Sequence, residues 1–349
     1  MRALTISAHG GAEQLAFRDD LAEPELRHPD DVRVRVHAAA LNHLDLFMLG
    51  GLPHITMTPP WIMGSDGAGV VEAAGPEAAV RPGDRVMLNP GISCGNCEYC
   101  RDDADPLCLS YGILGEHQPG TLAEYVVVPS RNVVRIPDAV DFTEAAAFPL
   151  ATLTAWRMVV TRAQVRAGDE VLIWGIGGGV AQQALQICKG IGARVWVTSG
   201  SDDKLDRARA LGADEVLNHS RVDVGREVRA RTGKRGVDVV VDSVGQATWK
   251  QSLGALGKRG RLVTCGGTSG PMVETDVRRL FWNQWTIMGS TMGTAREFAA
   301  IADELAAGRL RPVVDSVTPL TAGRRAFERL ASGQQFGKVV VDVQGMSSQ

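Results

Sequence analysis

The pattern of apolar and polar residues changes along the chain. Before residue 130 the apolar residues alternate with polar ones in short runs that glycine and proline interrupt. Runs of this kind, at 31–41, 67–75, 82–91 and 120–129, are typical of β-strands joined by turns. From about residue 142 the spacing becomes helical, and the segment 141–163 begins with an Asp and a Thr that can cap a helix.

The middle of the chain alternates regularly between two kinds of segment. Short apolar runs at 170–174, 194–200, 215–218, 237–245 and 261–267 are separated by amphipathic segments at 181–192, 202–212, 225–233 and 248–260. Strands that alternate with helices in this way predict a parallel, doubly wound sheet. This region is followed by an apolar run at 285–292, a helix at 294–308 and a last pair of strands at 312–320 and 336–343. Because these last strands resemble the first 130 residues, we expect them to return to the first domain.

Composition excludes several classes of function. A length of 349 residues suggests two domains. A net charge of −3 with 22% charged residues gives no bias toward nucleic acid or anionic membranes. No run of the sequence reaches the 18 or so apolar residues of a membrane span, and the first residues lack the apolar core of a signal peptide. We therefore expect a cytoplasmic protein that acts on a small molecule.

Four of the six cysteines, Cys94, Cys97, Cys100 and Cys108, fall within twenty residues. In a reducing compartment such a group is more typical of a metal site than of disulfides. Four thiolates satisfy tetrahedral zinc and leave no open position for water or substrate, so the group predicts a structural zinc. We expect the acidic neighbours Asp102, Asp103 and Asp105 to keep this loop solvated, and Cys188 and Cys265 to be buried thiols.

A glycine-rich turn joins the strand at 170–174 to the helix that follows it. This is the context that a dinucleotide-binding fingerprint requires, because the turn lets a pyrophosphate approach the positive end of the helix. The fingerprint is imperfect, since the position of its third glycine holds Val180. The residues expected to contact the cofactor at this turn are Gly175, Gly177, Gly178, Gly179 and Val180.

The end of the strand at 194–200 indicates which nicotinamide cofactor is bound. An acidic residue there would accept bonds from the ribose of NAD(H), but this chain has Thr198, Ser199 and Gly200, with Lys204 shortly after. Small hydroxyls and a cation favour NADP(H); the alternative is that Lys204 is a solvated helix residue. His219, after the next strand, could add a contact to the adenosine phosphate.

Taken together, these motifs resemble the medium-chain dehydrogenase/reductase superfamily, above all its quinone-oxidoreductase-like and zinc-binding-dehydrogenase-like members. The resemblance rests on "ALNHLDLFMLGG", "IMGSDGAGVVEAAG", the four-cysteine segment, "GTLAEYVVVP", "GIGGGVAQQALQICK" and "FGKVVVDV". It implies an α/β chain in which a mainly β, GroES-like catalytic domain is joined to a doubly wound Rossmann domain. The boundaries that we expect are 1–156 for the catalytic domain with a zinc lobe at 89–110, 157–294 for the NADP(H)-binding domain, and 295–349 for the return to the catalytic domain.

The same resemblance points to a second metal site that this chain lacks. Zinc alcohol dehydrogenases of the superfamily hold a catalytic zinc with a cysteine and a histidine–glutamate pair, and the matching positions here are Asn42, Ser65 and Asp66. An amide, a hydroxyl and one carboxylate are poor ligands for zinc. Without that metal, the substrate best suited to hydride transfer is one that already delocalises negative charge. We therefore expect NADPH-dependent reduction of a quinone, an enone or another activated double bond. The alternatives are an alcohol dehydrogenase or carbonyl reductase, with or without an unusual zinc site, and a non-catalytic NADPH-binding protein.

Further site residues follow from the resemblance. The catalytic candidates are Asn42, His43, Asp45 and Asp66, of which His43 could instead contact the cofactor phosphates and Asp45 could instead order its loop. Thr154 matches the segment beneath the nicotinamide, and Gly266 and Gly267 match the loop near its ribose. The resemblance also implies a homodimer or homotetramer that pairs through the strand at 285–292.

Overall fold

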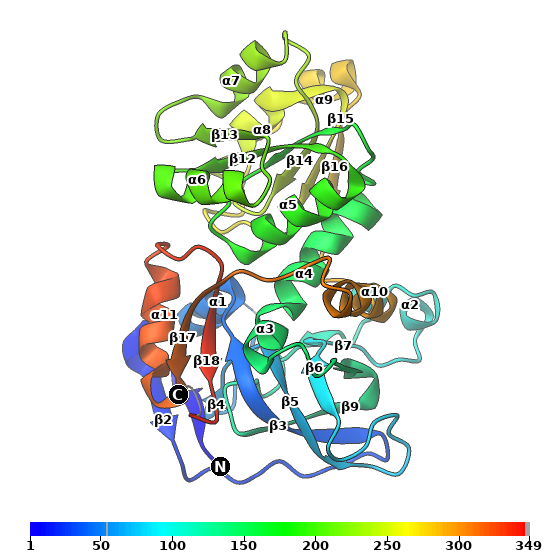
Figure 1. Cartoon of the computed structure of the whole chain (residues 1–349), viewed down its shortest axis with the longest axis vertical. Helices are drawn as coiled ribbons and strands as arrows, with labels where there is room; N and C mark the ends of the chain where they lie inside the picture. The colour runs from blue at the N-terminus through cyan, green and yellow to red at the C-terminus, as the bar shows by residue number, and fades with distance from the viewer. Residues whose placement is uncertain (54, 346–349) are drawn as a thin grey trace. The chain divides into compact units, whose positions relative to one another are not determined.

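The computed structural model describes residues 1–53 and 55–345. The chain divides into two compact units, which are described separately. Unit 1 comprises Met1–Ala151 and Gly293–Gln349, and unit 2 comprises Thr152–Met292. Unit 1 is therefore assembled from two stretches of sequence that unit 2 interrupts, and Figure 1 shows the chain leaving unit 1 and coming back to it. No helix among the described residues is long and apolar enough to cross a membrane.

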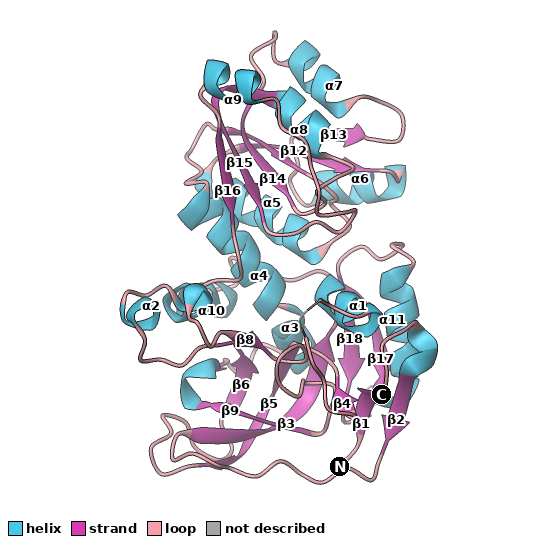
Figure 2. Cartoon of the chain, turned by 180° about the vertical axis from the view of Figure 1, so that it is seen from behind, coloured by secondary structure: helices cyan, strands magenta, loops and turns pink. Residues whose placement is uncertain are grey.

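Unit 1 is built on sheets in which most neighbouring strands are antiparallel. Its seven-stranded sheet has the order β10-β6-β5-β3-β18-β17, with β9 also pairing with β3 (Figure 2). A three-stranded sheet has the order β2-β1-β4, and β7 pairs with β8. The strands are β1 (Ala3–Ile6), β2 (Leu15–Arg18), β3 (Asp31–Ala40), β4 (Trp61–Ile62), β5 (Asp66–Ala74), β6 (Arg85–Leu88), β7 (Gly91–Ile92), β8 (Gly112–Ile113), β9 (Tyr125–Pro129), β10 (Val133–Arg135), β17 (Val314–Pro319) and β18 (Lys338–Asp342).

The helices of unit 1 include several that the apolar pattern did not predict. They are α1 (His43–Gly50), α2 (Glu98–Arg101), α3 (Phe142–Ala147), α4 (Pro149–Trp156), α10 (Ala295–Ala306) and α11 (Gly323–Ala331). The boundary between the two units falls within α4. The two last strands, β17 and β18, do pair, but in parallel. A parallel pair needs a crossover connection, and α11 provides it by burying Ala326, Phe327 and Leu330.

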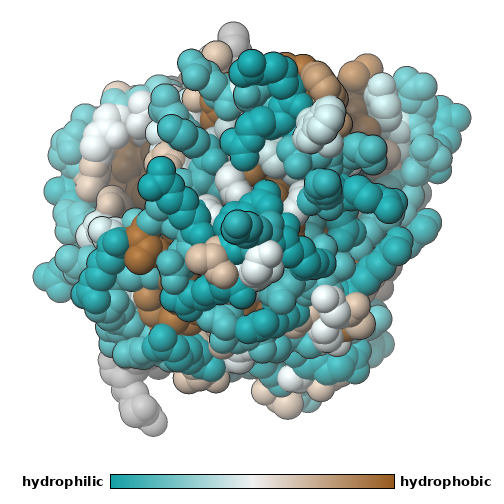
Figure 3. Space-filling model, turned by 90° about the horizontal axis from the view of Figure 1, so that it is seen from above, coloured by the Kyte–Doolittle hydropathy of each residue, from teal (hydrophilic) through white to brown (hydrophobic). Residues whose placement is uncertain are grey.

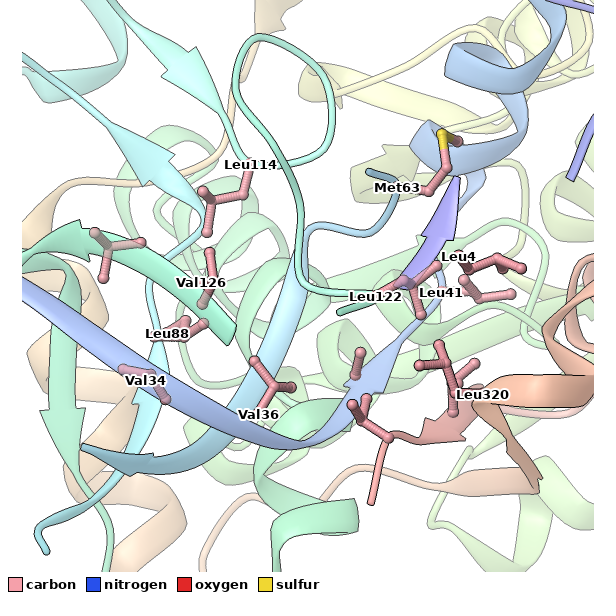
Figure 4. Packing of buried hydrophobic residues seen from close by; sticks show 14 of the residues in the cluster. Leu4, Val34, Val36, Leu41, Met63, Leu88, Leu114, Leu122, Val126 and Leu320 are labelled. Atoms are coloured by element: carbon pink, nitrogen blue, oxygen red, sulfur yellow. The ribbon is translucent and has the colours of Figure 1, made fainter. Parts of the chain in front are cut away.

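The core of unit 1 explains why the sequence before residue 130 alternates. Val32, Val34 and Val36 of β3 are fully buried, and the residues between them are more exposed. Figure 4 shows Val34 and Val36 packing with Leu88 of β6 and Val126 of β9, and Leu320 lying near Leu4 and Leu41. Residues from both stretches of sequence therefore share one hydrophobic core.

Unit 2 is a six-stranded parallel sheet of order β13-β12-β11-β14-β15-β16, which is the doubly wound arrangement that the sequence predicted. Its strands are β11 (Glu170–Ile173), β12 (Arg194–Ser199), β13 (Glu215–Asn218), β14 (Val237–Asp242), β15 (Leu256–Thr264) and β16 (Thr286–Gly289). Its helices are a π-helical turn (Arg157–Arg162), α5 (Gly179–Ile191), α6 (Asp202–Ala210), α7 (Val224–Arg231), α8 (Trp249–Ala255) and α9 (Val277–Asn283).

One predicted boundary in unit 2 is wrong. The helix expected at 248–260 ends at Ala255, and β15 begins at Leu256, where the sequence suggested helix and turn. Leu256 pairs with Val237 of β14 before the register shifts, and the Trp285 indole N–H donates to the Gly257 carbonyl at 2.8 Å. Contacts distant in sequence therefore override the helical spacing.

Candidate functional site

The four cysteines of the lobe at 89–110 lie together in unit 1. One ligand atom from each of Cys94, Cys97, Cys100 and Cys108 lies within 4.8 Å of every other. The Sγ atoms of Cys97 and Cys100 are 3.5 Å apart, and those of Cys94 and Cys100 are 3.9 Å apart. Tetrahedral zinc with Zn–S bonds of about 2.3 Å sets its sulfurs about 3.8 Å apart. The four thiols therefore fit a closed zinc site.

The backbone around the cysteines favours thiolates. The N–H groups of Asn96 and Cys97 stabilise the Cys94 sulfur and lower the pKa of Cys94 to about 6. The backbone N–H of Cys94 donates to the Cys108 sulfur at 3.4 Å, although burial and the neighbouring thiols of Cys94 and Cys100 raise the pKa of Cys108 to about 11. Hydrogen bonds of this kind fix the orientation of metal ligands and match them to a cation. Among residues 1–53 and 55–345, no other group of three or more His, Cys, Asp or Glu side chains is arranged to hold a metal ion.

The acidic residues of the lobe do more than keep it solvated. Asp105 accepts a hydrogen bond from the Ser93 hydroxyl at 3.2 Å and another from the Ala295 N–H, at the start of α10, at 3.1 Å. Asp103 pairs with Arg296 at 3.0 Å. The lobe is thus fastened to α10, which belongs to the second stretch of unit 1. None of the acidic neighbours belongs to the group of metal-ligating side chains, as expected, and Asp103 and Asp105 also fasten the lobe.

The glycine-rich turn of unit 2 has the geometry of an anion site. Gly175 has a φ of +73°, and its N–H donates to the Thr198 hydroxyl at 3.2 Å, which joins the turn to the end of β12. Gly178 is the N-cap of α5 and supplies no side chain to cap it. The first turn of α5, with Gly179 and Val180, therefore presents backbone N–H groups and the positive end of the helix dipole to a ligand. These residues fit a dinucleotide pyrophosphate, and Gly177 lies within the same turn.

The ends of β12 and β13 lie side by side and bring Ser199 and His219 together. The His219 N–H donates to the Ser199 carbonyl at 3.0 Å, and the His219 ring lies 5.9 Å from the ring of Trp174. Burial lowers the pKa of His219, which favours the neutral form of its ring. A Cβ at Gly200 would lie 2.9 Å from the Ser220 hydroxyl and 3.3 Å from His219 Nε2, so a larger residue there would require these side chains to move.

An acidic residue follows these strand ends but is already engaged. Asp202, the first residue of α6, accepts a hydrogen bond from Asn218 at 2.7 Å and pairs with Arg221 at 2.5 Å. Lys204 lies on the same helix, and its backbone N–H donates to the Ser201 N-cap at 3.5 Å.

The remaining candidates of unit 2 lie elsewhere in that unit. Thr154 is buried and donates to the Met292 sulfur at 3.9 Å. Gly266 and Gly267 follow β15, and Gly267 accepts from the Gly270 N–H at 2.9 Å. Cys188 is fully buried, and burial raises its pKa to about 12. Cys265 keeps part of its surface accessible, but burial raises the pKa of its thiol to about 12 as well.

In unit 1, Asn42 and Asp66 are brought together by a residue that the sequence did not single out. The Lys338 ammonium donates to the side-chain amide oxygen of Asn42 at 2.6 Å and to the Asp66 carboxylate at 2.9 Å. Asn42 donates in turn to the same Asp66 oxygen at 2.9 Å, and the Leu150 N–H donates to the other oxygen at 2.8 Å. Asp66 is fully buried and the Lys338 side chain is only 5% exposed.

This trio of Asn42, Asp66 and Lys338, which we call the lysine cluster, does not fit a zinc ion. Its one carboxylate is already paired with an ammonium, and its other oxygen donor, the Asn42 amide, binds the same ammonium. Zinc prefers thiolate and imidazole, and a second cation would be repelled by Lys338. Sequence reasoning missed Lys338, although a lone lysine in the apolar run "FGKVVVDV" is a recognisable signal.

Asp45 and His43 lie beside the lysine cluster on α1. The Asn42 N–H donates to the Asp45 carboxylate at 2.7 Å, so Asp45 caps the start of α1. Burial raises the pKa of Asp45 to about 7. His43 is exposed, and partial loss of hydration together with the charge of Lys338 lowers its pKa. Ser65 is buried next to Asp66 in sequence.

Comparison with known proteins agrees with both units. Residues 28–138 match the family model described as alcohol dehydrogenase GroES-like domain, and residues 179–307 match that described as zinc-binding dehydrogenase. Human quinone oxidoreductase is 30% identical over 349 residues, which cover 98% of this chain and 97% of that protein.

Two solved structures extend the comparison. One described as an NAD-dependent alcohol dehydrogenase is 45% identical with a TM-score of 0.94, covering 98% of this chain and 100% of the other. A 2-octenoyl-CoA carboxylase reductase, CinF, in complex with NADP and 2-octenoyl-CoA, is 28% identical with a TM-score of 0.91, covering 100% of this chain and 88% of the other.

The GroES-like unit, the parallel dinucleotide-binding sheet and these similarities define an oxidoreductase of the NAD(P)-dependent type. The chain belongs to the medium-chain dehydrogenase/reductase superfamily. The resemblance drawn from the sequence and the predicted fold class are both confirmed.

Proposed function

We propose that this protein is an NADPH-dependent reductase that transfers hydride to a quinone, an enone or another activated double bond without a catalytic zinc. The observation that carries the proposal is the lysine cluster, in which the Lys338 ammonium is buried against Asp66 and Asn42. The similarity to human quinone oxidoreductase supports the same conclusion.

The chemistry of the donor groups sets the class of substrate. Zinc in a dehydrogenase polarises a carbonyl and stabilises an alkoxide, and the lysine cluster offers no ligand set for it. An activated double bond needs less help, because hydride at its β-carbon leaves a charge that a conjugated oxygen delocalises as an enolate. Hydrogen-bond donors are then sufficient to stabilise the transition state. In unit 1, the Lys338 ammonium and the Asn42 side-chain amide would either supply these hydrogen-bond donors or hold the donor groups in place.

Bound NADPH would supply the hydride, and the chain's own task is to hold it. The N–H groups at the start of α5 would bind the pyrophosphate, and Gly175 and Gly177 let the backbone approach it. Thr154, Gly266 and Gly267 are proposed to contact the nicotinamide half. His43 is proposed to contact the cofactor phosphates or to donate a proton, and Asp45 to hold α1 and Asn42 in place.

The preference for NADPH rests on the ends of β12 and β13. Asp202 already accepts a hydrogen bond from Asn218 and pairs with Arg221, which weakens it as a partner for the ribose of NADH. Ser199 and Lys204 supply hydroxyl and cationic groups suited to a 2′-phosphate, and Arg221 would join them by exchanging its pair with Asp202 for the phosphate.

Cofactor preference can be measured directly by fluorescence titration with NADPH and NADH. Lys204→Ala and Arg221→Ala should each weaken NADPH binding about fivefold or more while changing NADH binding little, because only NADPH carries the 2′-phosphate. Arg209→Ala, which removes another cation of α6, is the matched control. Equal weakening of both cofactors would count against the assignment.

The substrate class is tested by a panel of quinones, enones, enoyl thioesters, aldehydes and alcohols, followed at the NADPH absorbance band. Zinc content is measured on the same sample. We expect one zinc per chain and turnover of conjugated acceptors. Two zinc ions per chain, with activity lost when the more labile one is removed, would overturn the proposal. Cofactor binding without turnover of any acceptor would indicate a non-catalytic protein.

A second candidate is an alcohol dehydrogenase or carbonyl reductase. The 45% identity to the structure described as an NAD-dependent alcohol dehydrogenase favours it. It predicts oxidation of alcohols with NAD, and the same panel distinguishes it from the first candidate. In either case we propose a cytoplasmic homodimer or homotetramer, paired through β16, which is the edge strand of its sheet.

A further inference from the structure

Unit 2 contains an open cavity of about 670 Å³ that is surrounded by five cationic residues, four of which are exposed to solvent. It lies between α7, the turn that follows α7, α8 and α9, and shares no residue with the proposed dinucleotide site. Its charged lining residues are Arg226, Arg229, Lys234, Lys250 and Arg279, with one acidic residue, Asp223. Since the whole chain carries a net charge of −3, this concentration of positive charge is a local feature.

The cations around the cavity have almost no acidic partners. Arg226 approaches Asp223 at 3.7 Å, and Asp223 also caps α7 through the Arg226 N–H. Across residues 1–53 and 55–345, neither Lys234, Lys250 nor Arg279 makes an ion pair with an acid. Like charges gathered on one concave surface repel each other, and an anionic ligand would remove that cost.

Two of the guanidinium groups are held in place by the backbone. Arg229 donates to the carbonyls of Gly254 at 3.1 Å and Lys234 at 2.6 Å, and also to that of Leu256. Arg279 donates to the Leu253 carbonyl at 3.4 Å and lies over the Trp285 ring at 5.2 Å. Burial and the neighbouring Arg279 lower the pKa of Arg229. These two guanidinium groups are therefore preorganised, because carbonyl oxygens fix their positions without neutralising them.

The helices α7 and α8 pack closely against each other beside the cavity. A side chain at Gly254 would lie 3.7 Å from the Cα of Gly225, so the two helices meet at a pair of glycines. Both glycines line the cavity. Figure 3 shows the end of the molecule at which Figure 1 places α7 and α9. Most of the surface in this view is hydrophilic.

We propose that this cavity binds a small polyanion that carries at least two phosphate or carboxylate groups. Five cations in one hollow match several anionic groups on one molecule, and a volume of about 670 Å³ lies in the range of small-ligand pockets. A nucleic acid would instead require a basic stripe that follows its backbone. The site is independent of hydride transfer and of the cofactor that supports it.

Calorimetry with tripolyphosphate as the probe tests the proposal on the full-length, zinc-loaded protein saturated with NADPH. Saturation with NADPH fills the proposed pyrophosphate site, and zinc content is checked before and after titration. The double variant Lys234→Gln, Lys250→Gln should bind tripolyphosphate about tenfold more weakly or worse, because two charge-assisted contacts are lost. Lys258→Gln with Arg259→Gln, which removes two exposed cations outside the cavity, should bind within about twofold of the parent. Thermal unfolding and NADPH affinity, measured on both variants, should match the parent.

Further arms of the experiment identify the ligand. Tricarballylate, a tricarboxylate that binds metals weakly, distinguishes carboxylate from phosphate recognition. Binding should weaken as salt rises from about 0.05 M to about 0.3 M, since the charges are screened. Equal binding by the two double variants, or no measurable binding by the parent protein, would overturn the proposal. So would tighter binding of a single-stranded oligonucleotide that depends on the same two lysines.

Discussion

The four-cysteine lobe and the lysine cluster are two polar centres of unit 1 that differ in how their negative charge is balanced. The lobe gathers four sulfurs within 4.8 Å of one another and brings no cation of its own. The lysine cluster also gathers oxygen donors around a buried point, but a side chain supplies the positive charge there, 2.9 Å from the Asp66 carboxylate.

The difference shows how to infer from a set of donor groups whether it requires a metal ion. Four thiolates at this spacing repel each other unless an ion lies between them, so the lobe is incomplete as a protein-only structure. The lysine cluster is already neutral and hydrogen bonded, so it is complete without an ion. Counting residues that can bind metals is therefore less informative than asking whether a cation is already present.

The largest expected effect comes from breaking the lobe. Cys97→Ala should reduce zinc content from one ion per chain toward none and lower the unfolding temperature sharply, because metal binding by such sites contributes about 10–16 kcal/mol to local folding. Metal analysis and calorimetric melting check this result. Cys188→Ala, which removes a buried thiol outside the lobe, should keep its zinc. An unchanged zinc content in Cys97→Ala would contradict the assignment.

Removing the cation of the lysine cluster should have the next largest effect. Lys338→Met leaves Asp66, which is fully buried, without its ion-pair partner, and should cost about 3–5 kcal/mol of unfolding free energy in urea. The double variant Lys338→Met, Asp66→Asn should recover much of that loss, because no uncompensated charge remains. If the single and double variants were equally stable, the pair would not be coupled.

Asp45 should make stability depend on pH. Its pKa is raised to about 7 by burial, whereas an unfolded chain has an ordinary carboxyl near 3.9, so the folded protein binds the extra proton between these values. Stability should therefore fall as the pH rises from about 4 to about 7, by up to about 4 kcal/mol for this group. Asp45→Asn should flatten that slope in urea unfolding at several pH values. A slope that persists unchanged in the variant would assign it to other groups.

The smallest effect is expected at the edge of the lobe. Arg296→Ala removes an ion pair with Asp103 in which the arginine side chain is 80% exposed. Pairs of this kind contribute about 0.2–1 kcal/mol, and salt screens them. The unfolding midpoint should shift slightly at low salt and not at high salt, with zinc content unchanged. A loss of zinc would mean that this contact holds the lobe together.

Local patterns in the sequence were sufficient for much of the fold. Alternation of strand and helix between 170 and 292 predicted the parallel sheet, and the cysteine spacing predicted the group that the lobe forms. The helix α11 and the early start of β15 escaped prediction, because both depend on partners distant in sequence, as Leu256 does on Val237.

The candidate site was less accessible than the fold. Asn42 and Asp66 were identified through family resemblance, but nothing in their own surroundings shows that a lysine near residue 340 pairs with them. Such a contact follows from the pairing of β18 with β3, where Val340 lies opposite Ala40. Register between strands so far apart cannot be read from local spacing.

The pairing of Lys338 with Asp66 also has a consequence for how the chain is made. The two residues are 272 positions apart, and the whole of unit 2 is synthesised between them. At about 5–20 residues per second, Asp66 is synthesised roughly 14–54 s before Lys338. Unit 1 therefore remains incomplete while unit 2 can already fold, and the ion pair of Asp66 can form only after Lys338 has been synthesised.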